Sequence, residues 1–142
     1  MSEPLSTDDV HDDPAPYSQG IMTGRTIRLA GQVPDDRDGR IVGTGIESQT
    51  RQAVANVEAL LAVADATLRD VVSVTAYLVD RGDVDGFNAT YAAAFPEPRP
   101  ARATVIVEDL VVDALVEIQA TAVRPAGESP GSAPSALDGS SD

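Results

Sequence analysis

The stretch TRQAVANVEALLAVADATLRDVVSVTAYLV, residues 50–79, holds a helical pattern followed by a strand pattern. Small or apolar residues of its first part recur at the helical repeat and fall on one face: Thr50, Ala53, Val54, Val57, Leu60, Leu61 and Ala64. From Val71 to Val79, the even positions are wholly apolar and the odd positions are mixed, which is typical of a strand with one buried face. The stretch therefore predicts a helix that packs against a sheet.

The neighbouring segments extend this alternation. SQGIMT and TIRLAG, on either side of Gly24-Arg25, predict a β-hairpin. A second helix is expected with Asp83 as its cap, and Pro96 should end it because the residue before a proline leaves helical geometry. Its buried stripe would be Val84, Phe87, Tyr91 and Phe95. The last two strands are expected at ATVIV, residues 103–107, and LVEIQATAV, residues 115–123.

The predicted order β-β-α-β-α-β-β is an α+β architecture, a mixed sheet with two helices on one face. The other face would carry Ser73, Thr75, Tyr77, Glu117 and Gln119 among apolar residues. Such a half-polar face fits burial against another copy of the chain. We therefore expect a closed homo-oligomer with sites in the clefts between subunits.

Two polar segments flank the predicted domain, which spans residues 14–125. Residues 1–13 are acidic and show no hydrophobic period, and residues 126–142 are rich in Gly, Ser, Pro and Ala. Such segments bury too little apolar surface to offset their ordering entropy, so we expect both to be mobile. The acidic start does not resemble a secretory signal, so the sequence predicts a cytoplasmic protein.

The residue inventory of the 142-residue chain excludes several chemistries. It has no cysteine, its ten basic residues are all arginine, and its one histidine, His11, lies in the acidic N-terminal segment. This rules against thiolate zinc sites, cysteine nucleophiles, lysine Schiff bases and P-loops, and makes a catalytic triad or a histidine metal cluster unexpected. The net charge of −13 argues against nucleic-acid and anionic membrane partners. We expect no metal and no cofactor.

Two charged residues remain as candidates for catalysis. Arg102 follows the proline-rich stretch FPEPRP, and a guanidinium matches a carboxylate with two parallel hydrogen bonds. Glu117 lies mid-strand among apolar neighbours, where burial would raise its pKa towards the range of a general acid or base. Alternatively, the two residues form a structural ion pair across adjacent strands.

Seven motifs resemble the RidA family, also called the YjgF family, of imine deaminases. They are PYSQG (16–20), AGQVP (30–34), QTRQAVANVEALL (49–61), DVVSVTAYLVD (70–80), FNATYAAAF (87–95), PARATVIVEDL (100–110) and LVEIQATA (115–122). The resemblance implies a chorismate-mutase-like fold and a trimer whose sheets line a central barrel. It also implies cofactor-independent hydrolysis of 2-iminobutanoate and 2-iminopropanoate, or their enamine forms, to 2-oxo acids and ammonia.

The resemblance further implies a role for individual residues. Arg102 would bind the substrate carboxylate and Glu117 would orient or activate the attacking water. The substrate-binding residues would be Tyr17, Gly31, Asn88 and Thr104. Each of three has a structural alternative: simple packing for Tyr17, a polar group on a helix surface for Asn88, and strand propensity for Thr104.

The sequence departs from the family pattern at Ala30, where many deaminating members carry Ser or Thr. The loss of that hydroxyl would change the substrate preference or the rate. A second function therefore stays open, a non-catalytic trimer that binds small carboxylates such as 2-oxo acids. A ribonuclease activity, also attributed to the family, is disfavoured by the acidic charge.

The acidic excess also generates a prediction about salt. It indicates either ordinary solubility or adaptation to high salt, and the complete absence of lysine favours the second. Concentrated KCl should then raise the melting temperature, because the ions screen repulsion between carboxylates. A thermal melt across a KCl series measures this, and a flat or falling melting temperature contradicts salt adaptation.

Overall fold

The structure is a computed structural model that describes residues 2–126 of the chain. Its strands are β1 (Ser2–Leu5), β2 (Gly20–Thr23), β3 (Thr26–Leu29), β4 (Val71–Leu78), β5 (Ala101–Ile106) and β6 (Val116–Val123). Its helices are α1 (Ile46–Val63) and α2 (Val84–Ala94). A short 3-10 turn, η1 (Leu68–Asp70), follows α1, and a second one, η2 (Arg81–Asp83), precedes α2. Every strand and helix predicted from the sequence is present, and β1 is additional.

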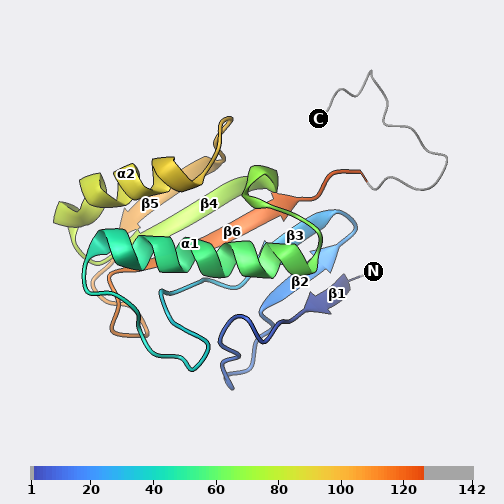
Figure 1. Ribbon diagram of the computed structural model, residues 1–142, viewed down its shortest axis with the longest axis horizontal. Coiled ribbons are helices and arrows are strands. Elements are labelled where there is room, and N and C mark those ends of the chain that lie inside the picture. Colours follow the sequence, from blue (N-terminus) through green and yellow to red (C-terminus); the bar gives the residue numbers. More distant parts are fainter. Residues whose placement is uncertain (1, 127–142) are drawn as a thin grey trace.

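The six strands form one mixed sheet in the order β1-β2-β3-β6-β4-β5. The pair β4–β5 is parallel and the other neighbours are antiparallel. Both helices cover the same face of this sheet (Figure 1). The predicted architecture, a mixed sheet with two helices on one face, is confirmed.

The core lies between the helices and the central strands. Along β6, alternate residues Val116, Ile118, Ala120 and Ala122 are at most 1% exposed. The apolar stripe of α1 and the aromatic residues of α2 belong to the same buried cluster. The period-two pattern of β6 and the helical period of α1 therefore meet in one core, as the sequence indicates.

Strand β4 differs from the prediction at its start. The sequence places Val72 on the buried face, yet Val72 is 48% exposed and Val71 is 4% exposed. A β-bulge shifts the pairing with β6 between Val71 and Ser73. Because a bulge adds one residue to a strand, it reverses the alternation of side chains at that point.

The second helix ends as predicted but is capped differently. Phe95 is extended before Pro96 and ends α2, but the Asp83 side chain makes no capping hydrogen bond. Asp80 takes that role one turn earlier, where its carboxylate accepts a hydrogen bond of 2.8 Å from the Gly82 N–H at the start of η2.

The prediction of a mobile segment over residues 1–13 is wrong for residues 2–13. Strand β1 pairs with β2 and extends the hairpin, while Leu5 and Val10 are only 7% and 4% exposed. The edge of β2 offers unpaired backbone groups to β1, and the two buried apolar side chains help to anchor this acidic segment. Of the predicted C-terminal tail, only Ala126 is among the described residues.

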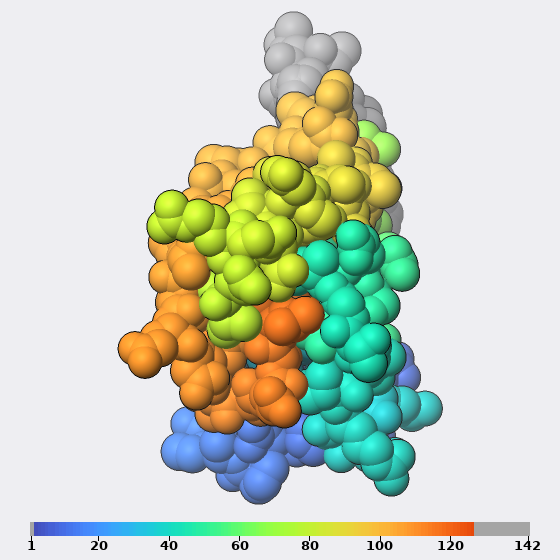
Figure 2. Space-filling model, turned by 90° about the vertical axis from the view of Figure 1, so that its left-hand side faces the viewer, coloured from blue at the N-terminus to red at the C-terminus, as the bar shows by residue number. Residues whose placement is uncertain are grey.

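Three segments far apart in sequence meet at one end of the molecule (Figure 2). They are the loop between β5 and β6, the start of α1 and the region of η2 and α2. The Gln49 side chain of α1 accepts a hydrogen bond of 2.7 Å from the Leu115 N–H, which ties the first two together. Among residues 2–126, no helix is long and apolar enough to cross a membrane.

The anchoring of the N-terminal segment can be measured. Leu5→Ala should lower the free energy of unfolding by about 2 kcal/mol or more, because it leaves a cavity under β1. Val111→Ala is the matched control, since Val111 is 100% exposed and its truncation should change stability by less than about 0.5 kcal/mol. Urea denaturation of both variants provides the comparison, and equal stability would mean that β1 does not pack on the core.

Candidate active site

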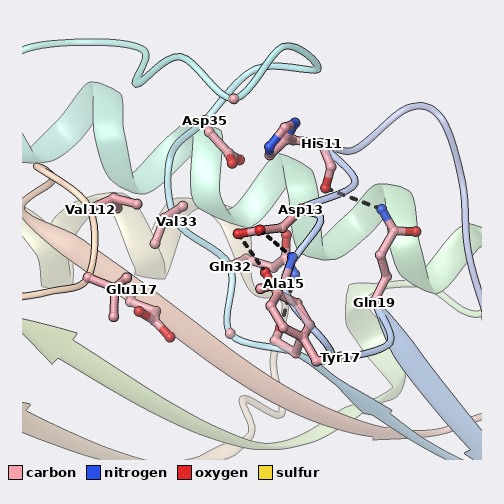
Figure 3. A pocket seen from close by; sticks show the side chains of 14 residues that line it. His11, Asp13, Ala15, Tyr17, Gln19, Gln32, Val33, Asp35, Val112 and Glu117 are labelled. Carbon is pink, nitrogen blue, oxygen red and sulfur yellow. Dashed lines mark hydrogen bonds between the residues drawn. The ribbon is translucent and has the colours of Figure 1, made fainter.

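The six residues expected to form the site lie in two separate groups. Tyr17, Gly31 and Glu117 line one open pocket of about 390 Å³ (Figure 3). Arg102, Asn88 and Thr104 are not among the residues of that pocket. They belong to α2 and to the edge strand β5. One chain therefore presents two parts of the expected site.

The alternation of β6 directs Glu117 into the pocket. Its neighbours Val116 and Ile118 point to the helices and are fully buried, so Glu117 points to the opposite face. Its partner across the sheet is Tyr77 on β4, which also lies on that outer face. On the other side of β6, Gln32 pairs with Ile118 and brings the loop after β3 alongside Glu117.

Gly31 lies directly against the Glu117 carboxylate. A Cβ atom at position 31 would stand 2.9 Å from Glu117 Cδ and would overlap Oε2, so only glycine permits this approach. Within residues 2–126, the Gly31 N–H donates no hydrogen bond, whereas the next amide, Gln32, donates to the Ile118 carbonyl at 2.7 Å. The backbone N–H of Gly31, without a partner in residues 2–126, therefore belongs to the residue that lies against the Glu117 carboxylate.

Burial raises the pKa of Glu117 above its ordinary value. Desolvation in the pocket is the cause, because it disfavours the charged form of a carboxyl group. Within residues 2–126, Glu117 has no ion-pair partner to offset that effect. A carboxyl group whose pKa is raised in this way holds a proton more tightly than an exposed glutamate, which suits a group that accepts and returns protons.

Tyr17 stands at the rim of the pocket and is 54% exposed. Its hydroxyl donates a hydrogen bond of 3.2 Å to the Asp13 carboxylate, which also accepts one of 2.9 Å from the Ala15 N–H. Partial burial, and then the negative charge of Asp13, raise the pKa of Tyr17. The hydrogen bond to Asp13 therefore holds the Tyr17 ring, with its hydroxyl group neutral, at the rim of the pocket.

The sequence analysis missed the wall that residues 7–13 contribute. Gln19, in the PYSQG motif, is 6% exposed and accepts a hydrogen bond of 2.8 Å from the Thr7 N–H. Its amide nitrogen donates to the carbonyl oxygens of Val10 and His11 at 3.2 and 3.3 Å. This clamp places His11 and Asp13 in the pocket lining, although the sequence suggested a mobile segment.

Asp35 is a further pocket residue that the sequence did not reveal. Asn56, on the buried face of α1, donates to the carbonyl oxygens of Val33 and Asp35 at 3.0 Å and holds this loop on the helix. Burial raises the pKa of Asp35, and the nearby charge of His11 opposes that effect. The run PDDRDG resembles a solvated loop, and only the buried Asn56 in the helical stripe hints that part of it is anchored.

Arg102 forms the second group on α2 and β5. It pairs with the buried Val74 of β4, so its side chain lies on the helix-covered face. Its Nη2 donates a hydrogen bond of 2.6 Å to Asn88 Oδ1. Thr104, two residues along β5, faces the same way and is half-buried.

This arrangement overturns the alternative of a structural ion pair between Arg102 and Glu117. The two strands are not adjacent, because β4 lies between β5 and β6. The side chains also point to opposite faces of the sheet, and no ion pair joins them. The structural ion pair is therefore excluded, and within one chain Arg102 does not face Glu117.

Arg99 is structural, because it donates to the carbonyl oxygens of Phe95 and Ala92 at 3.2 Å.

No group of three His, Cys, Asp or Glu side chains within residues 2–126 has the geometry to hold a metal ion. The residues that line the pocket include three with carboxyl groups, two glutamines, a tyrosine and a histidine, together with Gly31. Together with an arginine, such a set can bind a small carboxylate, position water and move protons.

A model of the endoribonuclease L-PSP family matches residues 10–124. The chain belongs to this family, the RidA or YjgF family. The match covers most of the chain and includes every motif quoted above. The membership predicted from those motifs is confirmed.

Relatives in the RidA family are similar over nearly their whole length. A RutC family protein of Pyrococcus horikoshii is 42% identical over 125 residues, covering 87% of this chain and 99% of that protein. A Salmonella typhimurium protein named 2-iminobutanoate/2-iminopropanoate deaminase is 35% identical over 127 residues, with the same coverage. Among solved structures, the Escherichia coli YjgF gene product has a TM-score of 0.82 at 34% identity, covering 87% of this chain and 99% of that chain.

The raised pKa of Glu117 predicts how stability depends on pH. A folded-state pKa above the unfolded value means that the folded protein binds the proton more tightly, so stability falls as pH rises through that window. Glu117→Gln removes this penalty and should be more stable than wild type at pH 7. The difference should vanish below the ordinary glutamate pKa of about 4.3.

Urea denaturation of the Glu117→Gln variant at neutral and acidic pH tests this. Glu58→Gln is the control, because Glu58 lies on the exposed face of α1. A Glu117→Gln variant that is less stable than wild type at pH 7 would show that the ionised carboxylate is stabilised in the folded protein.

Proposed function

We propose that the chain hydrolyses 2-imino acids such as 2-iminobutanoate and 2-iminopropanoate, or their enamine forms, to 2-oxo acids and ammonia, without a cofactor. The observation that carries this proposal is the desolvated Glu117 carboxyl group beside the free Gly31 N–H in an open pocket. The relatives named as deaminases support it.

The proposal requires more than one copy of the chain. Arg102 and Glu117 lie on opposite faces of one sheet, so a joint site needs Arg102 of one subunit at the pocket of a neighbour. The outer face favours such an assembly, because Val72 and Val105 are 48% and 39% exposed there. A homotrimer with three clefts between subunits, the form implied by the resemblance, satisfies this requirement.

In the proposed mechanism, Arg102 binds the substrate carboxylate with two charge-assisted hydrogen bonds, and the Gly31 N–H donates a further one. Glu117 accepts a proton from a water molecule, and the oxygen of that water attacks C2 of the imine. The electron pair of the C=N bond moves to nitrogen, which takes up a proton. The resulting carbinolamine then loses ammonia and leaves the 2-oxo acid. Water and imine are consumed one to one, so no oxidant or cofactor is needed.

Two other functions remain as alternatives. A non-catalytic trimer that binds 2-oxo acids would use Arg102 and Gly31 but would not need Glu117. The name of the family model favours a third function, cleavage of RNA. The charge of −13 and the absence of lysine argue against it, because RNA binding depends on basic groups that contact phosphates.

Activity assays distinguish the imine deaminase from the non-catalytic carboxylate-binding protein. A threonine dehydratase generates 2-iminobutanoate in situ, and 2-oxobutanoate formation is followed while semicarbazide competes for the imine. Arg102→Ala should lower kcat/KM by about 10- to 150-fold, the loss of one charge-assisted contact. Glu117→Ala should lower kcat by about 100-fold or more, the loss of a general acid–base.

Arg69→Ala is the matched control, because it removes the same charge from an exposed position outside the site. Mixing the Arg102→Ala and Glu117→Ala variants should restore activity, since about a quarter of the sites in randomly mixed closed oligomers would combine both intact residues. If Arg102→Ala behaves like wild type, the deaminase proposal fails. If Glu117→Ala leaves turnover unchanged while 2-oxobutanoate still binds, the binding protein is favoured.

A further inference from the structure

Two aromatic rings of α2 lie beside the guanidinium group of Arg102. The Arg102 Cζ atom is 4.7 Å from the ring centroid of Tyr91 and 5.1 Å from that of Phe87. Both separations are within the range of a cation–π interaction. Arginine stacks on aromatic faces better than lysine does, because its guanidinium is planar and weakly hydrated.

The rings are themselves fixed by the core. Phe87, Tyr91 and Phe95 recur every four residues along α2 and are 0%, 4% and 1% exposed. Their ring centroids are 5.5 Å apart for Phe87–Tyr91 and 4.4 Å apart for Tyr91–Phe95. A side chain that rests on this column therefore rests on a rigid surface, although Arg102 itself is exposed to solvent.

A hydrogen bond fixes the remaining freedom of the guanidinium. Asn88, one residue after Phe87, accepts the 2.6 Å bond from Arg102 Nη2. The arginines in ion pairs within residues 2–126 are Arg37, Arg40 and Arg99, so Arg102 keeps its charge unpaired. In a chain with 23 acidic residues, this stacked and hydrogen-bonded arginine thus retains donors that no carboxylate within residues 2–126 occupies.

We propose that Tyr91 and Phe87 are positioning residues for Arg102. Their rings set the plane of the guanidinium, Asn88 sets its rotation, and the remaining N–H groups are presented in advance to the substrate carboxylate. The benefit is preorganisation, because a long flexible side chain no longer has to be ordered when the ligand binds. This inference rests on the proposed role of Arg102 in carboxylate binding.

The hydroxyl group of Tyr91 provides a way to isolate the ring. It is buried and has no hydrogen-bond partner within residues 2–126. The role proposed for Tyr91 therefore belongs to its aromatic face, and Tyr91→Phe retains that face. Tyr91→Leu removes it while keeping an apolar side chain in the core.

The test measures KM, kcat and the Kd for 2-oxobutanoate in full-length variants whose melting curves and oligomeric mass match wild type. Tyr91→Leu should raise KM and Kd by about 3- to 30-fold, the range of a cation–π contact, with a smaller change in kcat. Tyr91→Phe should have KM and Kd values within threefold of wild type. Asn88→Ala should raise KM and Kd, as Tyr91→Leu does. If Tyr91→Leu does not fold, Tyr91→Met replaces it.

A double-variant cycle distinguishes positioning from a general structural role. In an Arg102→Ala background, Tyr91→Leu should have no further effect on Kd, because the ring acts through Arg102. Provided that Arg102→Ala itself is defective, three results would overturn the inference. They are additive losses of affinity in the double variant, a change of less than threefold in Tyr91→Leu, and equal defects in Tyr91→Phe and Tyr91→Leu. If Arg102→Ala alone leaves KM and Kd unchanged, the proposed function fails, and the positioning role fails with it.

Discussion

The pairing of β4 with β6 is the constraint on which the rest of this structure depends. Ala76 opposes Ile118 and Leu78 opposes Val116, and these four side chains are buried beneath the helices. Successive side chains of a strand point to opposite faces, so this register leaves no choice for the residues between them. A shift of one residue would bury Glu117 in the apolar core and expose the valine and isoleucine that now fill it.

The same register separates the two charged groups of the proposed site. Arg102 pairs with a buried residue of β4 and lies on the face of the helices, whereas Glu117 lies on the outer face. Each group is held by its own surroundings, Arg102 by α2 and Glu117 by Gly31 and the loop after β3. A single chain therefore presents the two parts of the proposed site on opposite faces of its sheet. Assembly would bring the carboxylate-binding group of one copy to the pocket of another.

The N-terminal segment shows where local sequence patterns are insufficient. Residues 2–13 are acidic and aperiodic, yet the buried Gln19 clamps them and Leu5 anchors them in the core. The hydrogen bonds that join Gln19 to Thr7 and Val10 span twelve and nine positions in sequence, and no composition rule detects them. The β-bulge after Val71 has the same character, because a strand pattern does not reveal which residue the partner strand skips.

The sequence by itself determined the helices, the central strands, their buried faces and the family, because period-two and helical patterns and contiguous motifs are local properties. Its motifs also pointed to six candidate site residues, of which Tyr17, Gly31 and Glu117 line one pocket, and the role of all six stays a prediction. Only the tertiary structure decided that β4 separates β5 from β6, that Arg102 rests on the aromatic column of α2, and that His11, Asp13 and Asp35 complete the pocket. The physical reason is that strand order and long-range hydrogen bonds depend on how the elements pack, and no local pattern encodes that.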